Sequence, residues 1–205
     1  LEELPESIGQ LSSLVTLGLD DCSSLAALPE SIGQLSSLLA APDCRSLAVL
    51  PESIGQLSSL VTLDLSGDVE ELLWNETSVF PMSLTALTGS IGKLTSLTTI
   101  DLTNCQSLAA LPRSIGKLSS LITLNLSYCK KLAALPGSIC KLPSLATLVL
   151  SNCGSLQALP ESIGQLSSLT TLDLTSCHSL EALPESIGQL SSLTTLDLAD
   201  CQNLE

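Results

Sequence analysis

Aromatic and basic side chains are both scarce in this sequence of 205 residues. It has one tryptophan, one tyrosine and one phenylalanine, and only seven lysines and arginines against 21 acidic residues. The resulting net charge of −14 opposes a nucleic-acid partner, which would need basic side chains and stacking aromatics. No apolar run approaches the roughly 18 to 20 residues of a membrane span. We therefore expect neither a nucleic-acid partner nor a membrane span.

A repeated unit of 24 residues fills most of the chain. Residues 159–182 read LPESIGQLSSLTTLDLTSCHSLEA, and nearly the same letters return in residues 183–205. Units this short stack into elongated arrays rather than folding alone. We therefore expect a single domain over residues 1–205, with about eight repeats that begin at Leu4, Leu28, Leu50, Leu87, Leu111, Leu135, Leu159 and Leu183.

The second half of each unit alternates leucine with polar residues, as a half-buried strand does. Leu172 and Leu174 are two apart and point to one side of an extended chain, whereas Thr171 and Asp173 point to the other. Such a unit cannot bury its leucines alone, so successive strands lie side by side in parallel, about 4.7–4.9 Å apart. The expected product is a curved α/β solenoid, a horseshoe with a parallel β-sheet on its concave side.

The first half of each unit predicts a short turn on the convex side. Ser162-x-x-Gln165 has the form of a capping box, in which the serine side chain begins a helical turn. The glycine and the paired serines nearby argue against a long helix. We expect one turn of 3₁₀- or α-helix, with Ile163, Leu166 and Leu169 directed inward.

The whole unit, LPxSIGxLxSLxxLxLxxCxxLxx, resembles the leucine-rich repeats of plant intracellular immune receptors, particularly those with a TIR domain. Its LPxSIGxL half also resembles the plant intracellular Ras-group leucine-rich repeat proteins. The resemblance implies a leucine-rich repeat solenoid. It also implies a recognition function, because those receptors use this region to recognise pathogen molecules or guarded host proteins. The sequence has no G-x-x-x-x-G-K-[ST] nucleotide-binding motif. We expect a recognition module of an immune or signalling protein, and a fragment of a larger multidomain chain.

Two of the repeats are irregular. The second has five residues between Leu38 and Cys44, where the other cysteine-bearing repeats have seven, and we expect a broken or edge-like strand there. The third carries an insertion around residues 68–82, which holds Trp74 and Phe80. Insertions in repeat proteins often lie on the binding face. Trp74 and Phe80 either bind a partner or pack over the irregular second repeat.

Seven of the eight cysteines share one position, directly after the strand. Side chains that project in parallel are poorly aligned for disulfides, so we expect a buried ladder of reduced thiols and a cytoplasmic location. Closely spaced ligands such as C-x₂₋₄-C are absent, and we expect no metal site. Cys140 replaces the glycine of the convex turn, and we expect it to be exposed and reactive. The ladder consists of Cys22, Cys44, Cys105, Cys129, Cys153, Cys177 and Cys201.

Catalytic groups are not brought together by this pattern. His178 is the one histidine, and it follows Cys177 directly. The cysteine points inward while the histidine begins a loop, so they cannot form the hydrogen-bonded pair that nucleophilic catalysis requires. We therefore expect no enzyme activity and no cofactor.

The sequence offers three candidate binding surfaces. Carboxylates on neighbouring strands repel by roughly 1 kcal/mol in water, which favours a protein or peptide partner with a basic patch, unless these are simply solvated positions. The residues of this concave row are Asp64, Asp101, Asn125, Asp173 and Asp197, with Tyr128 at the strand edge. The second candidate is the convex stripe of Lys93, Arg113, Lys117 and Lys141, which makes residues 87–158 basic, and the third is the insertion with Trp74 and Phe80.

A second kind of function rests on threonine. One concave position holds threonine in six repeats, which would form a flat and evenly spaced array. Such an array favours adsorption to a regular surface such as ice or a polymer. Its members are Thr62, Thr99, Thr123, Thr147, Thr171 and Thr195.

Overall fold

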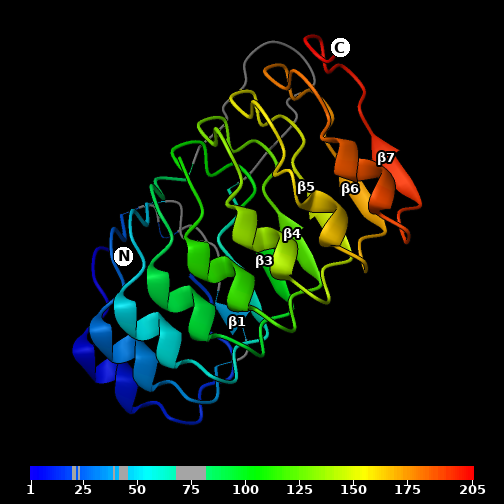
Figure 1. Cartoon of the computed structure of the whole chain (residues 1–205). Helices are drawn as coiled ribbons and strands as arrows, with labels where there is room; N and C mark the ends of the chain where they lie inside the picture. Colours follow the sequence, from blue (N-terminus) through cyan, green and yellow to red (C-terminus); the bar gives the residue numbers. More distant parts are fainter. Residues whose placement is uncertain (20–21, 23, 39, 42–45, 68–81) are drawn as a thin grey trace.

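The chain winds into a curved stack of coils, most of which contribute a short strand and a short helical turn (Figure 1). The computed structural model describes residues 1–19, 22, 24–38, 40–41, 46–67 and 82–205. Trp74, Phe80 and nearly all of the insertion lie outside the described residues, as do Pro42 and Cys44 of the irregular second repeat. Neither interpretation of the insertion is therefore tested.

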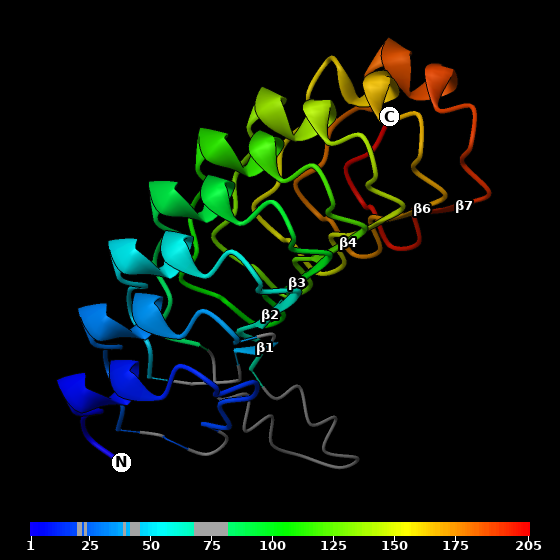
Figure 2. The ribbon, with the colours of Figure 1, turned by 90° about the horizontal axis from the view of Figure 1, so that it is seen from below.

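Seven strands form one parallel sheet in chain order. The first strand has two residues and is an edge strand of the described sheet, as expected of the shortened second repeat; the others have three. The strands lie along the inner curve of the stack and the helical turns along its outer curve (Figure 2). This arrangement confirms the predicted horseshoe. The strands are β1 (Ala40–Ala41), β2 (Thr62–Asp64), β3 (Thr99–Asp101), β4 (Thr123–Asn125), β5 (Thr147–Val149), β6 (Thr171–Asp173) and β7 (Thr195–Asp197).

Each strand from β2 to β7 has a leucine or isoleucine at its centre, flanked by residues that are polar except for Val149, and this alternation fixes its register. Leu172 is fully buried, whereas its neighbours Thr171 and Asp173 are half-buried on the opposite side. The sheet pairs Leu148 with Leu172 and Leu172 with Leu196, so equivalent residues of successive repeats stack on one another. A slip of one residue would turn every leucine toward water, so the register is strongly specified.

In the described part of the chain, the convex side consists of eight short 3₁₀ helices. Ile163, Leu166 and Leu169 are all fully buried beneath it, which confirms the predicted single turn with its apolar side directed inward. The helices are η1 (Glu6–Gln10), η2 (Glu30–Gln34), η3 (Glu52–Gln56), η4 (Gly89–Lys93), η5 (Arg113–Lys117), η6 (Gly137–Lys141), η7 (Ile163–Gln165) and η8 (Glu185–Gln189).

The capping-box prediction is wrong. Most of these turns follow a proline in extended conformation, so the serine is the second residue inside the turn, and no serine side chain caps it. Ser162 does precede η7, but its side chain makes no capping hydrogen bond either. The serine side chain instead packs against the preceding repeat. In four of these serines the hydroxyl is buried and has no hydrogen-bond partner among the described residues: Ser31, Ser53, Ser114 and Ser138.

The close approach between successive turns depends on glycine. A Cβ atom placed on Gly92 would lie 2.5 Å from the carbonyl oxygen of Ser114 and 2.7 Å from its Cβ. The same contact recurs between Gly9 and Ser31, where the distance to the carbonyl oxygen is 2.6 Å. Real Cβ atoms do not approach backbone this closely, so a larger residue must displace the next repeat.

Cys140 shows the consequence of such a replacement. It occupies the glycine position of η6 and faces Ser162, which forms a hydrogen bond with its thiol. The next turn, η7, begins two residues later in its repeat than the other seven turns. We attribute this shortening to the space that the cysteine side chain takes.

Two glycines of η4 provide a matched test of this packing. Gly92→Ala should lower the free energy of unfolding by about 1–3 kcal/mol, because the new methyl group overlaps the backbone of Ser114. Gly89→Ala should be neutral or stabilising by about 0.4–1 kcal/mol, since no atom lies within 4 Å of the position its Cβ would take. Urea denaturation of both variants measures the difference. Equal stability of the two would show that the stack tolerates wider spacing.

Candidate binding surface

The concave face presents side chains of successive strands in register. Thr62 pairs with Thr99, and the pairing continues through Thr123, Thr147 and Thr171 to the last strand. We call these six residues, which include Thr195, the threonine row. Their side chains are half-buried, or exposed in β7, and their hydroxyls form no hydrogen bond with other described residues. The hydroxyls are therefore available to a ligand or to water.

A second row lies two residues further along each strand. We call it the aspartate row: Asp64, Asp101, Asn125, Val149, Asp173 and Asp197, which are neighbours in this order across β2 to β7. The structure thus brings together the five concave residues that the sequence analysis singled out. It places Val149 among them.

Each aspartate of the row also shapes the turn that follows its strand. Asp101 Oδ1 accepts hydrogen bonds from the Thr103 backbone nitrogen at 2.8 Å and from its hydroxyl at 2.6 Å. Asp173 Oδ1 accepts from the Thr175 backbone nitrogen at 2.9 Å. Such bonds offset part of the repulsion between stacked carboxylates. The aspartates therefore have a structural role in the folded chain, and their mutual repulsion alone does not require a basic partner.

The uncharged Asn125 fits the same turn. Asn125 Oδ1 accepts from the Ser127 backbone nitrogen at 3.0 Å and from its hydroxyl at 2.6 Å, as the aspartates do. Its amide nitrogen donates to Asp101 Oδ2 at 3.2 Å. An asparagine at this position therefore keeps the turn and removes one negative charge from the row.

Tyr128 lies in the turn after β4, where the backbone adopts a left-handed conformation with φ of 60°. The equivalent residues of neighbouring repeats, Asn104 and Asn152, have φ of 63° and 61°. Asparagine tolerates this conformation far better than a bulky residue does. Tyr128 is half-buried, and its aromatic ring is held at the end of the concave face at some cost in backbone strain. The asparagines at this position of the repeat were the sequence feature from which the left-handed turn could have been predicted.

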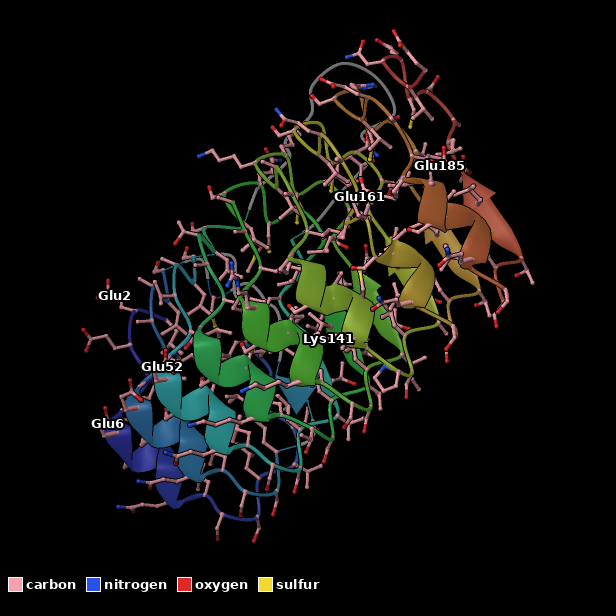
Figure 3. All side chains as sticks on the ribbon, viewed as in Figure 1. Glu2, Glu6, Glu52, Lys141, Glu161 and Glu185 are labelled. Atoms are coloured by element: carbon pink, nitrogen blue, oxygen red, sulfur yellow. The ribbon has the colours of Figure 1, made fainter. Side chains whose placement is uncertain are left out.

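The convex face carries a row of charges that changes sign along the stack. At one end, Glu6 accepts a hydrogen bond from the Ser31 backbone nitrogen at 3.1 Å, and Glu30 accepts one from Ser53 at 3.2 Å, so each carboxylate supports the next turn. In the middle, η4, η5 and η6 end in exposed lysines, Lys93, Lys117 and Lys141, and Arg113 begins η5. Figure 3 shows Lys141 on this face, with Glu52 toward one end of the stack and Glu161 and Glu185 toward the other.

The described ladder cysteines from Cys105 to Cys177 are buried, and their thiols donate to a carbonyl oxygen of the preceding repeat. Cys129 Sγ lies 3.4 Å from the Leu102 oxygen, and Cys153 Sγ lies 3.1 Å from the Leu126 oxygen. Burial raises the pKa of the Cys129 and Cys153 thiols, and it raises the pKa of Cys177 to about 12. The described cysteines are thiols rather than disulfides, as the sequence predicts for the ladder. The expectation of an exposed Cys140 is wrong: it is 3% exposed, because the next turn packs over it, and burial raises its pKa.

Cys177 and His178 face different surroundings. The Cys177 thiol donates to the Leu150 carbonyl oxygen at 3.2 Å, inside the stack. The His178 ring is exposed, with Nδ1 at 3.1 Å from the Asp200 carbonyl oxygen. Adjacent positions in sequence therefore do not make a catalytic pair. Within the ranges that the structure describes, no helix is long and apolar enough to cross a membrane, and no group of three His, Cys, Asp or Glu residues is placed to hold a metal ion.

Comparison with known proteins agrees with this geometry. Residues 112–183 match the model of Zer-1-like leucine-rich repeats. The leucine-rich repeat domain of the type III effector XopL is 29% identical, with a TM-score of 0.81 over all of this chain and 68% of that domain. A leucine-rich repeat protein of Leptospira interrogans is 28% identical, with a TM-score of 0.68 over 98% of this chain. No curated protein matches the sequence.

These similarities and the geometry show the fold: it is a leucine-rich repeat solenoid. It spans about half, 52%, of the length of the Leptospira protein. A plant ice-binding protein also shares the fold, with 21% identity and a TM-score of 0.51 over 90% of this chain and 63% of that one. At that identity the likeness concerns the fold alone.

The burial of the thiols predicts the order in which they react. Iodoacetamide at about pH 8 should label Cys22 and Cys201, which are partly exposed, well before Cys129, Cys140, Cys153 and Cys177. The buried thiols should react only after denaturation, because burial removes access and raises their pKa. Peptide mass mapping of labelled samples gives the rate at each site. If Cys140 is labelled as fast as Cys201, the Cys140 thiol is exposed, as the sequence predicts, and its burial in the structure is contradicted.

Proposed function

We propose that this chain is a non-catalytic recognition module that holds another protein or peptide against its concave sheet. The observation that carries the proposal is the pair of in-register rows on β2 to β7. Most of their side chains are polar and lie on the concave surface, whereas the leucines fill the core. Residues of such a row can be substituted, which changes the chemistry of the concave surface, without disturbing the stack. The general use of leucine-rich repeats as interaction surfaces supports the same function.

The wider setting is part of this proposal. The domain extends over residues 1–205 with about eight repeats and forms the ligand-sensing part of a larger immune or signalling protein. The resemblance of its repeat unit to plant receptors supports that role. The buried thiols favour a reducing compartment, and hence the cytoplasm.

The convex stripe and the insertion are the competing surfaces. Lys93, Lys117 and Lys141 are long, exposed side chains that form no ion pair with other described residues. They would attract an acidic partner, but nothing in the described chain fixes their orientation. The aspartates of the concave row are each held by at least one hydrogen bond, and preorganised groups bind at a lower entropic cost. We therefore favour the concave face.

Peptides selected from a random display library on the immobilised chain test this assignment. Thr147→Arg should weaken their binding by about tenfold or more, because it places a bulky cation in the middle of the concave face. Gln165→Arg is the matched control, since it adds the same side chain at an exposed convex position, and it should leave affinity unchanged. Fluorescence anisotropy measures both. Loss of binding with Gln165→Arg or with Lys117→Glu, but not with Thr147→Arg, would place the site on the convex face.

Adsorption to ice or a polymer is the second candidate. The threonine row supports it, since six hydroxyl and methyl pairs recur at the strand spacing of about 4.8 Å, and a plant ice-binding protein shares the fold. The aspartate row opposes it, because charged carboxylates beside the threonines keep their own water shell.

Ice-shaping microscopy separates the two candidates. We expect ice crystals grown with the purified chain to stay rounded, because the hydrated aspartates prevent a flat contact. Faceted crystals that become rounded with Thr123→Glu, but not with the convex Gln165→Glu, would instead establish adsorption through the threonine row.

A further inference from the structure

The aspartate row is not uniformly acidic, and its interruption falls in the middle of the sheet. Asp64 and Asp101 occupy β2 and β3, and Asp173 and Asp197 occupy β6 and β7. The two strands between them, β4 and β5, carry Asn125 and Val149, which are uncharged. The concave face therefore has two acidic segments with a neutral segment between them.

The neutral segment is also the more apolar part of the face. Ile122, directly before β4, is 46% exposed, and the smaller Val61 in the equivalent position before β2 is 37% exposed. Ala146, directly before β5, is its neighbour, since its backbone nitrogen donates to the Ile122 oxygen at 2.9 Å. Val149 is half-buried at the other end of the same strand. Apolar centres with a polar rim are the usual anatomy of protein interfaces.

The inner carboxylates on either side, Asp101 and Asp173, are oriented by hydrogen bonds. Asp173 is held through Oδ1, and its Oδ2 has no hydrogen-bond partner among the described residues. Asp101 is held through both oxygens, by Thr103 and by the Asn125 amide. Neither forms an ion pair within the described chain. Both therefore present an oriented carboxylate to whatever occupies the concave face.

The strand spacing sets the distance that a ligand must span. Asp101 on β3 and Asp173 on β6 are three strand steps apart, about 14 Å at roughly 4.8 Å per step. An extended peptide that crosses the strands advances about 3.3–3.6 Å per residue, so about four residues cover this distance. In an extended chain the side chains at alternate positions point the same way. Positions i, i+2 and i+4 therefore face the sheet together.

We propose that the concave face recognises an extended protein segment with lysine or arginine at positions i and i+4 and an apolar residue at i+2. The two cations lie at Asp101 and Asp173, and the apolar side chain lies over the neutral segment formed by Ile122, Asn125 and Val149. This inference rests on the proposed function, because it specifies the chemistry of the partner that the concave face holds.

Synthetic peptides test the spacing directly. The probe is capped, fluorescently labelled Gly-Lys-Ser-Leu-Ser-Lys-Gly, and its control is Gly-Lys-Lys-Leu-Ser-Ser-Gly, which has the same composition and charge. The chain should bind the probe about tenfold more tightly than the control in fluorescence anisotropy. Equal binding of the two peptides, or no binding of either, would overturn the proposal.

Matched substitutions then assign the contacts. Asp173→Asn should remove the preference for the probe, whereas Asp197→Asn should leave it, although both aspartates accept the same bond from a backbone nitrogen at 2.9 Å. Asparagine keeps that bond, as Asn125 shows, so both variants should fold normally. Val149→Asn should abolish the preference for leucine over serine at the central position of the probe. An unchanged preference in both Asp173→Asn and Val149→Asn would contradict the assignment.

The two proposals fail differently. If library peptides lose binding with Thr147→Arg but lack the alternating basic and apolar pattern, the spacing rule is wrong and the concave face remains the binding surface. If the library peptides are indifferent to Thr147→Arg, the proposed function itself is wrong.

Discussion

The contact of each repeat with the next is the interaction on which the structure depends. A single repeat has one strand of two or three residues and one short turn, which is too little to bury its own leucines. Burial is complete only because Leu148 stacks on Leu124 on one side and on Leu172 on the other. Every other feature follows from keeping this spacing constant: the glycine in all of the described turns except η6, the inward thiol and the parallel register.

The same constraint separates the positions that can vary from those that cannot. Gly92 must stay small because the next backbone lies against it, and Cys153 is fully buried, with its thiol donating to the Leu126 oxygen. The residues that face outward from the sheet have no such requirement. Aspartate, asparagine and valine all occupy one concave position without a change in strand length. A recognition function is therefore compatible with a rigid repeat in which only the surface differs.

Much of the fold was predictable because it repeats. Alternation and spacing in a single unit predict the period, the inward-facing leucines, such as that of β6, and the buried thiol ladder. The exposed position assigned to Cys140 and the capping role assigned to Ser162 were wrong for one reason. Both residues lie where two turns touch, and contact between repeats cannot be read from one repeat alone.

The candidate site was predictable only as a set of positions. Sequence spacing places Asp101 and Asp173 on one face, but it does not show that each accepts a hydrogen bond from the turn that follows. These bonds turn an apparently repulsive stack into a set of oriented acceptors. Nor does spacing show the left-handed backbone of Tyr128, which depends on the turn between strand and thiol.

A crystal structure of the chain with the tightest peptide from the display library would test the central claim most directly. The account predicts that the peptide crosses β3 to β6 on the concave side, in contact with the threonine and aspartate rows. A peptide bound along η4 to η6, on the lysines of the convex face, would contradict it.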